Sequence, residues 1–259
     1  MCFLCTSSFS GGDQLTFSIN DDETLEDLQL NGLFLIQKKH AFRFGMDSVL
    51  LAHFADIRSN DTVADIGTGN GAIIFLLYGR NKGKRFYALD IQQEAAELVQ
   101  RNADLNHMHE SVTVINADAE AASSYIPPCS VDAAVCNPPY GLPFSSLTSP
   151  CIEKATARTQ DAETIDHLLR GAFSILKGKG KLSLVYPASQ MLHIMNKLQS
   201  YHLEPKRFQL VYPYADKPAN LVLIEAVKDA RPTLHPMKPL IVHEQNGSLT
   251  NDLKSVYHI

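Results

Sequence analysis

The feature that most constrains the fold is a glycine-rich turn that follows a predicted strand. Residues 62–66 are predicted as a strand, and residues 67–71 read GTGNG before an apolar helical segment begins at Ala72. Glycines at alternate positions let the backbone turn sharply and approach a ligand closely. A strand, a glycine turn and a helix in this order predict an α/β unit that holds a nucleotide-like ligand at the turn.

The rest of the chain continues this alternation of strands and helices. Further strands are predicted at residues 85–91, 112–116, 131–136 and 182–186, and helices at 46–57, 94–105, 162–176 and 190–201. The last two strands, 208–212 and 220–227, are joined by a loop too short for a crossover helix, so they must be antiparallel. We therefore expect a doubly wound, seven-stranded, mostly parallel α/β sheet with one antiparallel strand.

Both ends of the chain fall outside this pattern. Residues 1–45 are predicted to be an N-terminal extension packed on the core, with a short helix in ETLEDL and a strand in GLFLIQ. Residues 46–230 form the predicted main domain. Residues 231–259 are rich in proline and are expected to be a surface tail with one edge strand at 240–243.

Composition argues against several classes of function. No apolar run reaches the roughly 18 residues needed to cross a bilayer, and the first residues lack the features of a secretory signal, so we expect a cytoplasmic protein without a membrane partner. Cys2 and Cys5 have no second cysteine pair, and the ten histidines show no metal-site spacing, so no metal is expected. The net charge of −5 disfavours nucleic-acid binding over the whole surface but allows a local basic face. Oligomeric state cannot be read from the sequence.

Acidic residues stand at the ends of three successive predicted strands. They are Asp65, Asp90 and Asp118. Asp90 lies 23 residues after Gly67, close to the spacing of an acidic residue that bonds a ribose diol. A carboxylate at Asp65 would repel a pyrophosphate but suits a cation, and Asp118 is placed to bond an adenine amino group. S-adenosylmethionine, with an ammonium, a sulfonium and no phosphate, fits this set.

The predicted strand VDAAVC runs directly into Asn137, Pro138, Pro139 and Tyr140. Two prolines cannot continue a strand, so they form a stiff segment at its carboxyl end, where open α/β sheets bind ligands. The exocyclic amine of adenine is a poor nucleophile because its lone pair is delocalised into the ring. The side-chain oxygen of Asn137 and the carbonyl of Pro138 can accept its two hydrogens, while Tyr140 stacks on the base. We predict these four residues to be catalytic.

These motifs resemble the class I S-adenosylmethionine-dependent methyltransferases, and NPPY resembles their amino-methylating branch. FRFGMDSVLLAHF, residues 42–54, is similar to the segment before the cofactor loop in bacterial tRNA (valine) adenine-N6 methyltransferases, and the similarity runs from about residue 22 to the C terminus. The resemblance implies a Rossmann-like methyltransferase fold and an adenine near the anticodon of tRNA as the substrate. Relatives often carry ARHE after NPPY, whereas this chain reads ARTQ, with Thr159 in place of the histidine.

Two sets of site residues follow. Those predicted to bind the cofactor are Asp47, Asp65, Gly67, Thr68, Gly69, Asn70, Gly71, Asp90, Ile91, Asp118, Ala119 and Asn137. Those predicted to bind the tRNA are Lys38, Arg43, Arg158 and Lys217, a modest cluster that suits phosphates around a flipped-out base. The basic runs at 80–85 and 177–181 are expected in helix-to-strand loops at the opposite edge of the sheet, where cations are favoured by helix ends.

Other functions stay open at this point. A protein glutamine N5-methyltransferase faces the same delocalised nitrogen, and an rRNA guanine N2-methyltransferase is also compatible with NPPY. A DNA adenine methyltransferase is less favoured, because no insertion is large enough for a target-reading domain. A nicotinamide-dependent oxidoreductase is disfavoured by the glycine spacing and Asp65. A methyl-donor-binding scaffold without catalysis would have little use for all of Asn137–Tyr140.

Overall fold

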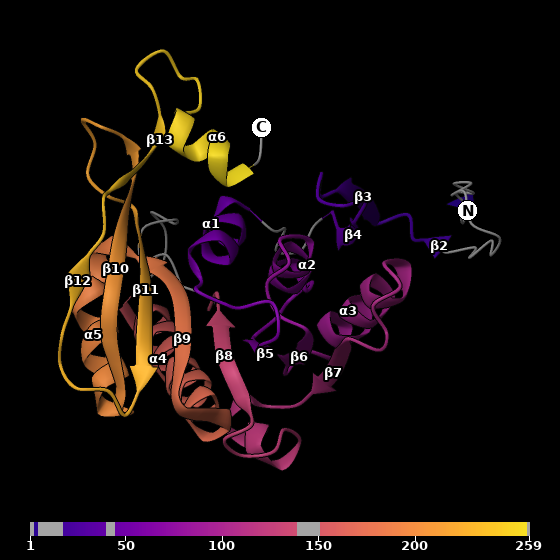
Figure 1. Cartoon of the computed structure of the whole chain (residues 1–259), viewed down its shortest axis with the longest axis horizontal. Helices are drawn as coiled ribbons and strands as arrows, with labels where there is room; N and C mark the ends of the chain where they lie inside the picture. Colours follow the sequence, from indigo (N-terminus) through magenta and orange to yellow (C-terminus); the bar gives the residue numbers. More distant parts are fainter. Residues whose placement is uncertain (1–2, 5–17, 40–44, 139–150, 258–259) are drawn as a thin grey trace.

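The computed structural model describes residues 3–4, 18–39, 45–138 and 151–257, and at 3–4, 18 and 151–162 it describes the backbone alone. The strands of its main sheet are β5 (Thr62–Ile66), β6 (Arg85–Asp90), β7 (Val112–Asn116), β8 (Val131–Cys136), β9 (Leu176–Pro187), β10 (Leu203–Tyr214), β11 (Leu221–Lys228), β12 (His235–Pro236) and β13 (Leu240–His243). Their order is β12-β10-β11-β9-β8-β5-β6-β7, and β13 also pairs with β10 (Figure 1).

The direction of the strands agrees with the prediction of one reversed strand. Strands β5 to β9 pair in parallel, whereas β11 is antiparallel to both of its neighbours, β9 and β10. Strand β11 is inserted between β9 and β10, so β10 runs in the same direction as β8 and ends at the same edge of the sheet. Figure 1 shows the arrow of β8 pointing to the top of the view and that of β11 pointing to the bottom.

Within the described residues, the sheet has nine strands rather than the seven predicted. The predicted edge strand at 240–243 is confirmed as β13, and β12 joins the same side of β10. Residues 251–257, expected to be part of a surface tail, instead form a helix whose Leu253 and Val256 are buried in the core. The proline-rich sequence of this region did not indicate these elements, because each is short. The strands form only by pairing with β10, and the helix only by packing on the core.

Helices cover both faces of the sheet. They are α1 (Met46–Phe54), α2 (Ala72–Gly79), α3 (Gln93–Leu105), α4 (Cys151–Ile175), α5 (Met191–Ser200) and α6 (Asn251–Tyr257), with short 3-10 turns η1 (Ala119–Ser124) and η2 (Ala188–Gln190). One apolar cluster joins the sheet to α1, α2, α3 and α6, and a second joins it to η1, α4 and α5. Along β5, Val63 faces the first cluster, and Ala64 and Ile66 face the second, as the two-residue period of a strand requires.

The N-terminal region contains a hairpin where a helix was expected in part. The segment ETLEDL was predicted to be helical, but Glu23–Asp27 is strand β3, paired antiparallel with β4 (Phe34–Lys38). Between them, Asn31 and Gly32 both have positive φ, 51° and 74°, which suits the Asn-Gly turn of a tight hairpin. The Asn-Gly pair correctly indicates a hairpin here, despite the helical propensity of the glutamates and leucines in this segment. A further short strand, β2 (Ser18–Ile19), pairs with β1 (Phe3–Leu4).

Asn102 of α3 and Asn106, the residue that caps the C-terminal end of this helix, hold the hairpin on the core. The side-chain oxygen of Asn102 accepts from Ile36 N at 2.7 Å, and its Nδ2 donates to Ile36 O at 3.0 Å. Asn106 repeats the pattern one turn later with Phe34 N at 2.9 Å and Phe34 O at 2.7 Å. The amides satisfy backbone groups along β4 that no strand pairs, so the hairpin is docked through its edge.

The order of the strands places a crevice beside β5. The chain leaves β5 toward β6, which lies on one side of β5. Strand β8 lies on the other side of β5, and the chain leaves β8 toward β9. The connections therefore leave the carboxyl ends of β5 and β8 in opposite directions. Open α/β sheets bind their ligands in such a crevice. The glycine turn after β5 and the residues Asn137 and Pro138 after β8 therefore lie at one place, as the sequence predicted.

Candidate functional site

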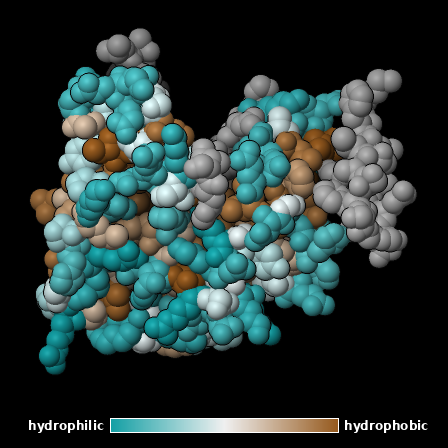
Figure 2. All heavy atoms as spheres, turned by 45° about the horizontal axis from the view of Figure 1, so that its top comes forward, coloured by the Kyte–Doolittle hydropathy of each residue, from teal (hydrophilic) through white to brown (hydrophobic). Residues whose placement is uncertain are grey.

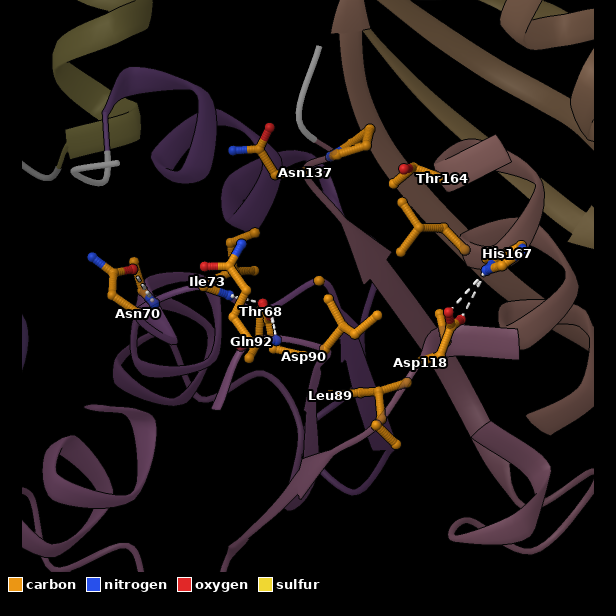
Figure 3. A pocket seen from close by; sticks show the side chains of 18 of the residues that line it. Thr68, Asn70, Ile73, Leu89, Asp90, Gln92, Asp118, Asn137, Thr164 and His167 are labelled. Carbon is orange, nitrogen blue, oxygen red and sulfur yellow. Dashed lines mark hydrogen bonds and ion pairs between the residues drawn. The ribbon is translucent and has the colours of Figure 1, made fainter. Parts of the chain in front are cut away.

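A cavity of about 620 Å³ lies at the carboxyl ends of β5, β6 and β8 (Figure 3). Its walls come from the glycine turn, the ends of β6 and β7, the first turn of η1, the end of β8 and one side of α4. The lining residues are Ser48, Gly67, Thr68, Gly69, Asn70, Ala72, Ile73, Leu89, Asp90, Ile91, Gln92, Ala117, Asp118, Ala119, Asn137, Pro138, Thr164, His167 and Leu168.

Most of the predicted site residues line this cavity. From the cofactor set these are Gly67, Thr68, Gly69, Asn70, Asp90, Ile91, Asp118, Ala119 and Asn137, and from the catalytic set Asn137 and Pro138. Pro139, Tyr140 and Arg43 fall outside the described residues, and so does the side chain of Arg158. Asp47, Asp65 and Gly71 are described but do not line the cavity.

The glycine turn and the end of β6 are tied together through Asp90. Gly69 N donates to Asp90 Oδ2 at 2.9 Å, and Gln92 N donates to Asp90 Oδ1 at 2.9 Å. Gly69 has a φ of 58°, and no atom lies within 4 Å of where a Cβ would sit. The turn thus leaves open space in front of a carboxylate whose direction is fixed by two backbone donors. Each oxygen keeps capacity to accept a further hydrogen bond from a ligand hydroxyl.

Asp65 lies behind the turn rather than in the cavity wall. Its side chain is fully buried, Oδ2 accepts from Thr68 Oγ1 at 2.8 Å, and Oδ1 has no partner among the described residues. Burial raises the pKa of Asp65 to about 7, and the charge of Asp90 adds to this, against the lowering effect of the Thr68 hydroxyl. The sequence placed Asp65 in contact with a cationic ligand, whereas its observed contact is with the turn, through Thr68.

Gly71 and Asp47 also have positions away from the lining. Gly71 caps the start of α2 with a φ of 80°, and a Cβ there would lie 2.9 Å from Phe75 and 3.2 Å from Val99. Asp47 is in the first turn of α1, where its charge contributes to a raised pKa of Tyr257 in α6, after the larger effect of burial. Gly71 is therefore required by packing. The next residue after Asp47, the buried Ser48, is the one that lines the cavity.

At the far end of the cavity, Asp118 meets a residue that the sequence did not indicate. His167 Nδ1 lies 3.0 Å from both carboxylate oxygens of Asp118, and Glu120 N donates to Asp118 Oδ1 at 2.8 Å (Figure 3). Burial tends to raise the pKa of Asp118, but the Glu120 amide and His167 outweigh it and hold that pKa below its ordinary value. Asp118 is therefore an ionised acceptor.

Other lining residues were also missed by sequence reasoning. They are Ser48, Ala72, Ile73, Leu89, Gln92, Ala117, Thr164, His167 and Leu168. Ala72, Leu89, Gln92 and Ala117 neighbour predicted site residues in the chain and could have been included on that ground. Ser48, Thr164, His167 and Leu168 come from α1 and α4, whose orientation over the crevice is set by tertiary packing.

Asn137 and Pro138 close the cavity at the end of β8 (Figure 3). Strand β8 lies between β5 and β9 and is buried along nearly its whole length, so its last residues are held by neighbours on both sides. The preceding residue, Cys136, is buried, and desolvation raises the pKa of its thiol far above the ordinary value. This cysteine is thus an inert part of the core, and the polar group offered to a ligand here is the amide of Asn137.

The donors and acceptors of the cavity suit S-adenosylmethionine. Two carboxylates, Asp90 and Asp118, line the described walls, which contain no lysine or arginine. The Nδ2 of Asn70 is buried and has no hydrogen-bond partner among the described residues. Carboxylates without basic residues favour a cationic ligand over a phosphate, and an unpartnered amide donor suits a carboxylate of that ligand.

Of the residues predicted to bind the tRNA, Lys38 and Lys217 have described side chains. Lys38 forms an ion pair with Glu94 of α3, which offsets its charge. Lys217 is exposed in the turn after β10, at the edge of the sheet where Asn137 lies. On the face shown in Figure 2, hydrophilic residues predominate and hydrophobic ones appear in small groups between them.

The two basic runs have partners elsewhere in the fold. In the first, Lys82 donates to the carbonyls of Ala52, His53 and Ala55 at the end of α1, so it is a structural cap. The second was expected in a loop, but its residues lie inside β9, where Lys177 and Lys181 pair with Asp132 and Asp56.

Two further kinds of structure are absent from the described residues. No group of three or more His, Cys, Asp or Glu side chains is arranged there to hold a metal ion. Within the same residues, no helix combines the length and the apolar character needed to span a bilayer.

Comparison with known proteins identifies the family. The family model of the methyltransferase small domain matches residues 44–205, more than half of the chain. A tRNA1(Val) (adenine(37)-N6)-methyltransferase from Bacteroides thetaiotaomicron is 30% identical over 170 residues, which cover 65% of this chain and 70% of the relative.

Solved structures share the fold. A predicted O-methyltransferase from Agrobacterium tumefaciens superposes with a TM-score of 0.66 and 24% identity, over 82% of this chain and 96% of that one. TrmK from M. capricolum, solved with the cofactor product S-adenosyl-homocysteine, gives a TM-score of 0.53 and 17% identity over 74% and 72% of the two chains. The chain therefore belongs to the methyltransferase small-domain family and is an S-adenosylmethionine-dependent methyltransferase.

Proposed function

We propose that this enzyme methylates the N6 amine of an adenine in tRNA, next to the anticodon. The observation that carries the proposal is the position of Asn137 and Pro138 in the wall of the cavity that also contains Asp90 and Asp118. A relative that shares 30% identity with this chain is named a tRNA1(Val) (adenine(37)-N6)-methyltransferase, which supports the same substrate here.

The cofactor site is proposed to span the cavity from Asn70 to Asp118. Asp90 would accept hydrogen bonds from the ribose hydroxyls, and Asp118 one from the adenine amino group. Asn70 Nδ2 would donate to the carboxylate at the other end, and the open space at Gly69 would admit the ligand close to the backbone. When bound, S-adenosylmethionine supplies an electrophilic methyl group on a sulfonium, near the end of β8.

Asn137 and Pro138 are proposed to prepare the target amine. Each of its two hydrogens is donated to an oxygen, one to the Asn137 side chain and one to the Pro138 carbonyl. With both hydrogens held, the nitrogen turns its lone pair out of conjugation with the ring and toward the cavity. The two oxygens are fixed before the base arrives, since β8 and a proline restrict them, so little reorganisation is needed. The surplus proton leaves to water, because a methylated amine sheds it readily, and no strong base is required.

Recognition of the tRNA is proposed to use basic residues at the same edge of the sheet. Lys217 is the described candidate, and Arg43 and Arg158 are expected to contribute. Lys38 is a weaker candidate because of its ion pair with Glu94. Tyr140 is proposed to stack on the flipped-out adenine. A tRNA substrate also implies that the enzyme works in the cytoplasm.

The experiment that tests the proposal is nucleoside mass spectrometry of tRNA incubated with the enzyme and isotope-labelled S-adenosylmethionine. We expect the label on N6-methyladenosine alone, in one nucleotide next to the anticodon. Label on N2-methylguanosine in rRNA, or on glutamine N5 of a protein added to the same reaction, would replace the proposed substrate with that alternative. Binding of the donor without transfer to any of these polymers would favour a scaffold.

A further inference from the structure

We propose that His167 is a positioning residue that orients Asp118 toward the cofactor's adenine and sets the preference for a 6-amino purine. The proposal rests on the proposed cofactor site but not on the identity of the methyl acceptor. It starts from the contact at the far end of the cavity, where α4 passes over η1 (Figure 3).

His167 bonds to Asp118 in one defined way. Its Nδ1 is equidistant, at 3.0 Å, from the two oxygens of Asp118. An ionised carboxylate has no hydrogen to give, so Nδ1 must carry the proton and donate it to the pair of oxygens. The other ring nitrogen, Nε2, lies 3.4 Å from Glu120 Oε2, and Glu120 is held in turn by Arg170. Glu120 therefore holds this second side of the imidazole only when Nε2 also carries a proton, whereas the bond from Nδ1 to Asp118 does not need that proton.

These contacts leave Asp118 with little free acceptor capacity. Oδ1 receives the Glu120 amide at 2.8 Å and shares the His167 proton, so both of its lone pairs are engaged. Oδ2 shares only the His167 proton and keeps one lone pair. Because the cavity includes Asp118, that lone pair is the group presented to the ligand. An adenine amino group can donate to it, whereas the carbonyl of a 6-oxo purine would be repelled.

Asp118 depends on His167 for this orientation. The Asp118 side chain is 37% exposed, in contrast to the fully buried Asp65, so its orientation depends on its hydrogen bonds to Glu120 N and His167. His167 is less exposed, at 30%, and belongs to a long helix. The neighbouring residue of α4, Leu168, also lines the cavity and lies against Gly67, where a Cβ would be 3.6 Å from it.

The backbone of α4 lies very close to η1 beside this contact. Four residues after His167, a Cβ at Gly171 would lie 2.2 Å from Ala119 O, so only glycine permits the observed approach of α4 to η1. His167 and Gly171 are one turn apart on the same side of the helix. The close approach at Gly171 therefore sets the distance across which His167 reaches Asp118.

The test compares three variants of His167 that differ in which donor they keep. His167→Asn places an amide N–H at the position of Nδ1, His167→Gln places one near the position of Nε2, and His167→Leu keeps neither. Affinity for S-adenosylhomocysteine and for its 6-oxo analogue, S-inosylhomocysteine, is measured by calorimetry on the full-length protein, with thermal unfolding measured for each variant. His193→Asn, on the exposed side of α5, is the matched control.

We expect roughly tenfold weaker binding of S-adenosylhomocysteine in the leucine and glutamine variants, and a change of less than about threefold in the asparagine variant and the control. The preference for S-adenosylhomocysteine over the 6-oxo analogue should fall only in the leucine and glutamine variants, which have no N–H at the position of Nδ1. A uniform loss in all three His167 variants, or an unchanged preference in the leucine variant that still unfolds at the wild-type temperature, would overturn the assignment. Neither result would affect the identity of the methylated nucleoside.

Discussion

A single buried carboxylate gives the glycine turn a pH dependence. The folded protein favours the neutral form of Asp65, whose pKa is raised to about 7, above its ordinary value near 4, because burial disfavours its charge. Folding then takes up a proton at Asp65 between these two values. The stabilisation is complete below about pH 4 and is lost as the pH rises through about 7.

This sign predicts the behaviour of Asp65→Asn. Between pH 5 and pH 8 the free energy of unfolding of the wild type should fall relative to that of the variant by about 2–3 kcal/mol. Urea unfolding of both proteins at several pH values measures this difference in the free energy of unfolding. Contributions of groups that titrate in both proteins cancel in the comparison. Parallel curves across this range would mean that Asp65 is charged in the folded protein at neutral pH.

Residues also show where sequence reasoning succeeds at the site. Asp90 and Asp118 were predicted because the ends of parallel strands meet at one edge, a rule that needs no side-chain detail. His167 could not be predicted, since its role depends on the rotation of α4 over η1, which glycine at 171 and the packing of the helix decide. The ion pair of Lys38 could not be predicted, because its partner, Glu94, is 56 positions away in the chain.

At the scale of elements, α4 and η1 form one wall of the cavity through a close backbone contact. A Cβ at Gly171 would lie 2.2 Å from a carbonyl oxygen, whereas none of the surrounding atoms lies within 4 Å of a Cβ at Gly178. We expect Gly171→Ala to lower the free energy of unfolding by about 1–3 kcal/mol and to weaken binding of S-adenosylhomocysteine, because α4 must move away from Asp118. Gly178→Ala should change both by little.

Calorimetry and urea unfolding of these two variants provide the check. Wild-type affinity and stability in Gly171→Ala would show that α4 can shift without consequence for the site. Equal effects of the two substitutions would point to general backbone sensitivity instead of the contact with Ala119.

The hairpin of β3 and β4 is held to the core by polar contacts of α3. Asn102 is fully buried and bonds Ile36 N, Ile36 O and, at 3.2 Å, the carbonyl of Asn70 in the glycine turn. Replacing it with leucine leaves three buried backbone groups without this partner, so Asn102→Leu should cost about 3 kcal/mol or more. Gln100→Ala, on the exposed side of the same helix, should cost less than about 0.5 kcal/mol.

Urea unfolding measures both costs, and fluorescence or calorimetry of cofactor binding adds a second readout. Because Asn102 also supports the turn at Asn70, its loss should weaken binding of S-adenosylhomocysteine as well. A stable Asn102→Leu variant would mean that water or another side chain satisfies the edge of β4.

The helices and strands also show which parts of the fold cannot be predicted from local sequence patterns. The alternation of strands and helices from β5 to α5 was predicted because short apolar runs alternate there with helical segments, of which α3 and α5 have one apolar face. Segment 23–27 was wrongly predicted as a helix, because its conformation depends on pairing with β4 and on the Asn-Gly turn. The C-terminal elements were partly missed because β12 and α6 are too short to show a period.

At the scale of the whole molecule, the direction of β10 brings its turn to the catalytic edge. Lys217 lies after β10, which runs parallel to β8, whereas Lys84 lies before β6 at the opposite edge; both side chains are exposed. If tRNA binds at the edge of the sheet that holds the cavity, Lys217→Ala should weaken tRNA binding. It should also reduce the slope of the logarithm of the binding constant against the logarithm of the salt concentration by about one, as expected for one lost phosphate contact. Lys84→Ala should leave both unchanged.

Binding titrations at several salt concentrations measure this pair of variants. Lys84 is a better control than Lys82, whose ammonium caps α1 and whose loss would disturb the fold. Equal losses at both lysines would indicate that tRNA is not directed to the edge of the sheet that holds Asn137.

The central claim is that Asn137, together with the carbonyl of Pro138, makes a delocalised amine reactive at the end of β8. It is tested most directly by single-turnover methyl transfer to tRNA catalysed by Asn137→Ala, with S-adenosylhomocysteine affinity measured on the same protein. The account predicts that the rate falls on the order of 100-fold or more while the affinity stays within about threefold. A rate near that of the wild type with unchanged affinity would contradict it.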